Sequence, residues 1–247
     1  MIYSYFVRGQ KHATLCQVSM QAVKKADPDA VVVVASDDHQ LKVPGAEMVY
    51  FKPGLPLMVA NLEAQLTVMS ITPGPIVFLD TDVLFLKPFF VDQKDDIVVT
   101  WRNTVGGVIE DIPGGVADFM PYNFGVVGVN TSLRAIESFI WMRTRIEKMS
   151  DNFQQWWGNQ IALAALCGPR PETDYATEER KIPWRISAPG PTVRISKLPG
   201  SMWNHTPNSE DEDLSERGAV HFKGHTRPWM KSCVERLGFE WMEKADD

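Results

Sequence analysis

The stretch VFLDTDVLFL, residues 77–86, joins a strongly apolar segment to two carboxylates. Its β-forming start predicts a strand over residues 76–79 that is covered on both faces. Asp80 and Asp82 follow at spacing i and i+2, and the apolar residues then resume. Carboxylates in such a run are costly to bury unless they are paired or bound to a cation. Two of them in one turn can hold a hard divalent ion that bridges a diphosphate, whereas the alternative is a strand-ending turn with solvated aspartates.

Toward the N-terminus, strand and helix patterns alternate. Short apolar runs predict strands over residues 2–7, 30–35 and 47–51, and helical periodicity predicts helices over 14–26 and 56–69. This order predicts a mostly parallel sheet with right-handed crossovers and helices on its faces. In such a sheet, ligands bind at the carboxyl ends of the strands.

The second half of the chain is less regular. Strands are expected at residues 97–101, 123–129, 193–195 and 219–222, helices at 133–149 and 156–166, and a mobile glycine-rich loop at 106–115. The sequence contains neither an internal repeat nor a linker of the composition that separates domains. We therefore expect one α/β domain, residues 1–247, with an elaborated C-terminal half.

Composition excludes several classes of protein. The 247 residues carry 25 basic and 31 acidic side chains, a net charge of −6, which argues against nonspecific nucleic-acid binding. Cys16, Cys167 and Cys233 are far apart and form no C-x-x-C pair, which argues against a disulfide framework and a structural zinc site. No signal-peptide pattern and no apolar run of about 18 residues is seen, so we expect a cytoplasmic protein without a membrane span.

Three segments in order carry a more specific resemblance: FLDTDVL at 78–84, YNFGVVGVN at 122–130 and HFKGHTRPW at 221–229. Together they resemble the motifs of nucleotide-sugar glycosyltransferases of the GT-A type, in particular glycosyltransferase family 8. The resemblance implies a GT-A, Rossmann-like, mostly parallel sheet flanked by helices. It also implies a nucleotide-sugar-binding half at residues 1–100 and an acceptor half at 101–247.

The resemblance implies a metal site. Carried over position by position, the ligands are Asp80, Asp82 and His221, and the ion is Mn²⁺ or Mg²⁺. An imidazole among oxygen ligands favours Mn²⁺. His225 is a nearby rival for the role of His221.

The donor site follows from the same motifs. Asp80, through the bridging ion, and Gly224 and Arg227 are expected at the diphosphate, with Arg227 standing where the family has a lysine. Asp37 and Asp38 follow the four-valine strand and are expected at the base and ribose, the alternative being a helix cap or turn. One departure is that the helix at 56–70 lacks the basic residue that the family usually presents to the donor.

The resemblance also implies residues at the reacting sugar and the acceptor. Gln160 and Asn159 are the catalytic candidates, although Asn159 stands where the family tends to have an aspartate. An amide can orient hydroxyls but cannot act as a base or a nucleophile at neutral pH. The second motif places Asn123 and Gly125 on the acceptor side. Trp157, Trp203 and Asn204 are also expected substrate contacts, because a tryptophan beside a glycine or an amide suits stacking on a sugar face; the alternative for the tryptophans is a place in the core.

The expected activity is metal-dependent transfer of a hexosyl group from a nucleotide diphosphate sugar, a UDP-sugar by preference, to a hydroxyl acceptor with retention. Glu110, Asp111 and Asp118 are candidate bases, so an inverting reaction stays open. The acceptor can be a saccharide, a lipid-linked glycan, a protein or a modified nucleobase. One alternative is a nucleotidyltransferase, although residues 8–12 match a phosphate loop poorly. The other is a noncatalytic sugar-binding module.

Overall fold

The computed structural model describes residues 1–102, 120–168, 176–181 and 192–242. Its main sheet has the strand order β3-β2-β1-β4-β7-β6-β9-β8. The strands are β1 (Ile2–Phe6), β2 (Val31–Ser36), β3 (Glu47–Tyr50), β4 (Pro75–Leu79), β6 (Ile97–Trp101), β7 (Tyr122–Asn130), β8 (Ala176–Lys181) and β9 (Thr192–Pro199). Only β7 and β8 run antiparallel to their neighbours in this sheet. The expected mostly parallel α/β sheet is confirmed.

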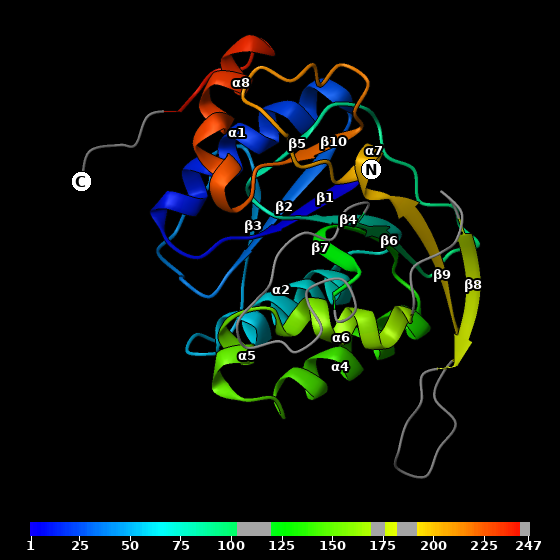
Figure 1. Ribbon diagram of the computed structural model, residues 1–247. Coiled ribbons are helices and arrows are strands. Elements are labelled where there is room, and N and C mark those ends of the chain that lie inside the picture. The colour runs from blue at the N-terminus through cyan, green and yellow to red at the C-terminus, as the bar shows by residue number, and fades with distance from the viewer. Residues whose placement is uncertain (103–119, 169–175, 182–191, 243–247) are drawn as a thin grey trace.

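Helices cover both faces of the sheet (Figure 1). One face carries α2 (Leu57–Ile71), α4 (Leu133–Ile146), α5 (Asp151–Gln155) and α6 (Gly158–Cys167). The other face carries α1 (Gln10–Ala26), α8 (Met230–Arg236) and a two-stranded sheet of β5 (Val83–Phe85) and β10 (Ala219–His221). The short helix α7 (Gly200–Trp203) and the 3-10 helix η1 (Gly224–Trp229) complete the described elements.

Each face of the main sheet is covered by its own apolar core. Because successive side chains of a strand point to opposite faces, Val33 and Ile76 pack on the α2 side, and Val34 and Val77 pack on the α1 side. Strands buried on both faces read as continuous apolar runs, which explains why β2 and β4 were visible in the sequence.

Some expected boundaries differ from the structure. The helix expected at 156–166 begins at Gly158, because Trp157 adopts a left-handed conformation (φ 70°) just before α6, and the short helix α5 that precedes it was not predicted. The strands β5 and β8 were not predicted, and the glycine-rich segment at 106–115 lies outside the described residues. Within the described parts of the chain, none of the helices combines the length and apolar character needed to cross a membrane.

Candidate functional site

The turn after β4 positions the two aspartates. The backbone N–H of Asp80 donates to the carbonyl of Gly125 on β7 (3.0 Å), which continues the β4–β7 ladder past the strand end. The N–H of Val83 donates back to the carbonyl of Asp80 (3.2 Å), so the chain turns and starts β5. The side chain of Asp82 is 6% exposed and that of Asp80 is 42% exposed. The carboxylate of Asp82 is therefore buried, and that of Asp80 is partly buried.

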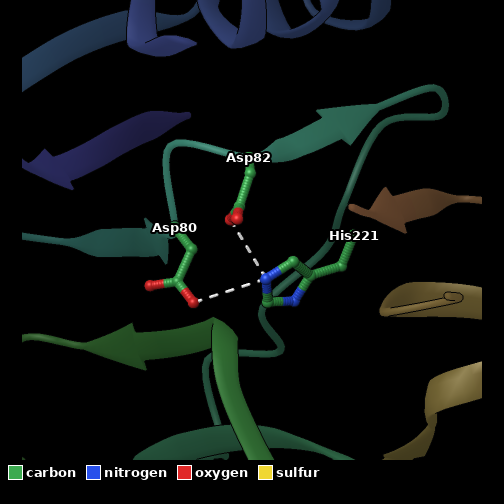
Figure 2. Close-up of side chains that lie close together, drawn as sticks. All are labelled: Asp80, Asp82 and His221. Atoms are coloured by element: carbon green, nitrogen blue, oxygen red, sulfur yellow. Dashed lines mark ion pairs between the residues drawn. The ribbon is translucent and has the colours of Figure 1, made fainter. Parts of the chain in front are cut away.

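His221 reaches this turn through the pairing of β10 with β5. The antiparallel register places His221 opposite Val83, and the N–H of Phe222 donates to the carbonyl of Asp82 (2.9 Å). The imidazole Nε2 then lies 3.1 Å from Oδ1 of Asp82 and 3.6 Å from Oδ2 of Asp80 (Figure 2). The pairing of two strands that are distant in sequence thus assembles the cluster.

These three side chains fit a divalent cation. One ligand atom from each lies within 4.8 Å of the others. Adjacent ligands of an octahedral ion at 2.0–2.1 Å are about 3 Å apart, so small rotations of the side chains suffice to surround an ion. Two carboxylates and one imidazole are a donor set suited to Mn²⁺ or Mg²⁺.

Cationic side chains surround the cluster. The guanidinium of Arg227 donates from Nε to Oδ2 of Asp82 (3.0 Å) and from Nη2 to the same oxygen. Lys223 interacts electrostatically with both aspartates and with Arg102. Negative and positive groups therefore share one site, as the binding of a metal ion together with an anion requires.

The pKa shifts reflect this crowding. Burial acts to raise the pKa of Asp82, but the charges and hydrogen bonds of His221 and Arg227 outweigh burial and hold it well below its usual range. The pKa of Asp80 is raised, chiefly by burial. The charge of His221 acts to lower this pKa, and the charge of Asp82 acts to raise it. Burial and then the charge of Arg102 lower the pKa of Lys223 to about 7. A cation stabilises the ionised form of Asp80, and an anion stabilises the charged form of Lys223.

Both expected catalytic amides lie on α6, and Gln160 contacts β7. The side-chain oxygen of Gln160 accepts from the Arg102 guanidinium and from Nδ2 of Asn123 (3.4 Å). Asn159 is 7% exposed, and its Nδ2 lies 3.5 Å from Oδ1 of Asn61. Hydrogen bonds connect Gln160 to His221 through Asn123 and Asn204, whereas Asn159 contacts Asn61 of α2.

Asp37 and Asp38 lie at the carboxyl end of β2. Asp37 accepts two hydrogen bonds from Arg8, which also donates to the carbonyl of Leu55 (3.1 Å). Asp38 accepts from the backbone N–H of Gln40 (2.9 Å), which is the turn that the alternative interpretation expected. Contacts of either side chain with a base or ribose stay predictions.

The remaining expected substrate residues have diverse surroundings. Trp157 is 38% exposed at the start of α6, whereas the Trp203 ring packs on Phe85 and Phe89. Asn204 is buried and bonded to protein groups, and Gly224 is exposed with a left-handed backbone (φ 57°). Trp203 is thus packed against aromatic rings and Asn204 is hydrogen-bonded within the protein. Contacts of either residue with a sugar stay predictions.

Sequence reasoning missed three basic residues at this site. Arg102 directly follows β6, a strand whose carboxyl end faces the same edge as that of β4, so the strand-end rule was a usable signal. Lys223 lies inside the C-terminal motif but was not singled out. Nothing in the local sequence marked His12, whose Nδ1 lies 3.3 Å from Oγ1 of Thr81.

Known protein structures share the fold of this chain. No family model and no curated protein matches the sequence. The galactosyltransferase LgtC, solved with donor and acceptor sugar analogs, superposes over 96% of this chain and 94% of its own, with a TM-score of 0.55 and 14% identity. The chain has the GT-A fold of glycosyltransferases. The expectation from the three motifs is therefore confirmed at the level of the fold.

A second neighbour is the glycosyltransferase GlyE of Streptococcus pneumoniae TIGR4. Its apo form superposes over 97% of this chain with a TM-score of 0.56 and 13% identity. The chain spans only 60% of the length of GlyE. The shared part is thus the GT-A fold itself.

Proposed function

We propose that this protein transfers a sugar from a nucleotide diphosphate sugar, a UDP-sugar by preference, to a hydroxyl acceptor in a metal-dependent reaction. The observation that carries the proposal is the convergence of Asp80, Asp82 and His221 at the carboxyl end of β4 on a GT-A fold. Structural neighbours that are glycosyltransferases support the activity, and one of them was solved with donor and acceptor analogs.

Asp80, Asp82 and His221 would hold the ion, Mn²⁺ by preference. The chemistry that a divalent cation supplies at such a site is neutralisation of the charge that develops on the leaving diphosphate. Lys223 and Arg227 provide further positive charge beside the two aspartates. The left-handed backbone at Gly224 leaves open space where a Cβ would stand, so a phosphate can approach its N–H closely.

Gln160 is the residue proposed to face the reacting sugar carbon. Arg102 and Asn123 hold its side-chain oxygen, and LgtC has also been solved as an active-site variant in which glutamate replaces glutamine. Because an amide is neither a base nor a strong nucleophile, this arrangement favours front-face attack and retention over a covalent intermediate. Glu110, Asp111 and Asp118, the candidate bases of an inverting reaction, lie outside the described residues.

The donor's base and ribose are proposed to lie near the ends of β1 and β2. Arg8 and Asp37 form an ion pair there, and the side chain of Asp37 is only 8% exposed. Residues 1–100 then form the donor half, and residues 101–247 form the acceptor half. The acceptor remains any of the hydroxyl-bearing classes named above.

The test is a screen of nucleotide sugars for Mn²⁺-dependent release of the nucleoside diphosphate. We expect release with one or a few UDP-sugars, and loss of release in chelator. His221→Ala should raise the Mn²⁺ concentration needed for half-maximal rate, whereas His225→Ala, an exposed histidine that packs on Trp229, should not. Release that is insensitive to chelator, or damage from His225→Ala alone, would contradict the proposed site.

A further inference from the structure

Asn204 directly precedes a β-bridge, contacts His221 of the Asp80–Asp82–His221 cluster and is only 6% exposed. Its side-chain oxygen lies 2.9 Å from Nδ1 of His221. Its side-chain nitrogen lies 2.8 Å from Oγ1 of Thr100 and 2.9 Å from Oδ1 of Asn123. The orientation of this amide determines the protonation of Nδ1. An amide oxygen facing Nδ1 requires a proton on Nδ1, whereas an amide nitrogen facing it requires Nδ1 to be free of a proton.

The surrounding hydrogen bonds determine that orientation. A backbone N–H can only donate, and the N–H of Gly125 points to Oδ1 of Asn123 (2.8 Å). A guanidinium can only donate, so the Gln160 oxygen that it contacts is an acceptor, and Asn123 must present its nitrogen there. Two obligatory donors, from Gly125 and Arg102, therefore require the same orientation of the Asn123 amide.

The orientation of Asn204 follows from that of Asn123. Because Oδ1 of Asn123 is an acceptor, the Asn204 atom that faces it is the amide nitrogen. The Asn204 oxygen then faces His221, and Nδ1 of His221 must carry the proton of their 2.9 Å hydrogen bond. The other ring nitrogen, Nε2, faces Asp80 and Asp82 and is the atom available as a ligand.

We infer that Asn204 is a positioning residue, which holds His221 in the orientation and tautomer that present Nε2 to the metal. The inference rests on the metal site of the proposed function. It gives the buried Asn123–Asn204 pair a purpose other than sugar contact, since the polar atoms of Asn204 are all engaged with the protein. Hydrogen bonds of this kind to a metal-binding histidine typically change metal affinity 10–100-fold.

The experiment compares Asn204→Leu with Thr100→Val. The first variant keeps a similar volume but removes the acceptor of the His221 N–H, whereas the second removes a different partner of the same amide. Mn²⁺ affinity is measured by calorimetry on the folded proteins. We expect Asn204→Leu to weaken Mn²⁺ binding about 10–100-fold, and Thr100→Val to leave Mn²⁺ affinity nearly unchanged.

A second measurement needs no variant and stands if Asn204→Leu fails to fold. Imidazole ¹⁵N NMR of the native protein, metal-free and with diamagnetic Mg²⁺, should show Nδ1 of His221 protonated in both states. A proton-free Nδ1 overturns the inference, as does equal Mn²⁺ affinity of folded Asn204→Leu and the native protein. Absence of Mn²⁺ binding by the native protein instead overturns the metal site of the proposed function, and the inference falls with it.

Discussion

The imidazole of His221 lies against the backbone of Gly125, in the space that any larger residue would fill. A Cβ at Gly125 would come within 2.4 Å of Nδ1 and Cε1 of His221. The same glycine donates its N–H to Asn123 and its carbonyl accepts from Asp80. Gly125 therefore supports the arrangement of Asp80 and His221 through its backbone N–H, its carbonyl and its lack of a side chain.

Gly125→Ala should displace the His221 ring and weaken Mn²⁺ binding at least about tenfold, by the scale for disturbed metal-ligand orientation. Val126→Ala, at the next and fully buried position of β7, should lower stability through lost packing without changing Mn²⁺ affinity. Calorimetric titration of both folded variants tests this. Native-like Mn²⁺ affinity in Gly125→Ala would show that His221 is not a ligand in the arrangement seen here.

The two aspartates should differ in their effect on stability. Asp82→Asn removes the charge that pairs with His221 and Arg227 inside the protein, and should lower the free energy of unfolding by about 1–3 kcal/mol. Asp80→Asn, at the more exposed carboxylate, should change it by less than about 0.5 kcal/mol. Denaturant unfolding without metal measures both. Both variants should abolish transfer, so an active Asp80→Asn enzyme that still requires metal would contradict the assignment.

Lys223 should contribute to nucleotide binding without contributing to metal binding. Lys223→Met should weaken UDP binding in Mn²⁺ about tenfold, equivalent to about 1.4 kcal/mol, because it removes a cation beside the proposed diphosphate site. Lys231→Met changes an exposed lysine on α8 and serves as the control. Equal UDP affinity for Lys223→Met and Lys231→Met would remove Lys223 from the donor site.

We expect replacement of Trp157 to reduce activity more than it reduces stability. Its left-handed backbone costs a non-glycine residue roughly 1–2 kcal/mol, so Trp157→Gly should leave the free energy of unfolding unchanged or slightly raised. Trp156 has an ordinary extended backbone (φ −139°), and Trp156→Gly should lower stability. With an identified acceptor, Trp157→Gly should raise the acceptor KM. An unchanged acceptor KM would show that strain at this position serves no substrate contact.

The sequence predicted the parallel half of the sheet because its strands are buried on both faces and read as continuous apolar runs. The fold and the cluster of Asp80, Asp82 and His221 were predicted from the three motifs. The spacing of Asp80 and Asp82 marks a candidate site by itself. The approach of His221 depends on the pairing of β5 with β10, which no local pattern shows.

Other features were not predictable for physical reasons. The break between α5 and α6 arises from one left-handed tryptophan, a conformation that residue type does not predict. The roles of Asn123 and Asn204 depend on which amide atom faces which neighbour, and that is a property of the assembled hydrogen-bond network. The strand β8 is polar in sequence and exists by pairing with β9.

The central claim is that Asp80, Asp82 and His221 bind a nucleotide diphosphate through a divalent cation. The most direct measurement is calorimetric titration with UDP, in Mn²⁺ and in chelator, for the native protein and the Asp80→Asn, Asp82→Asn double variant. The account predicts UDP binding by the native protein in Mn²⁺, and loss of at least about two decades of affinity, or about 2.7 kcal/mol, in chelator or in the double variant. UDP binding of equal strength in chelator, or unaffected by the double substitution, would contradict it.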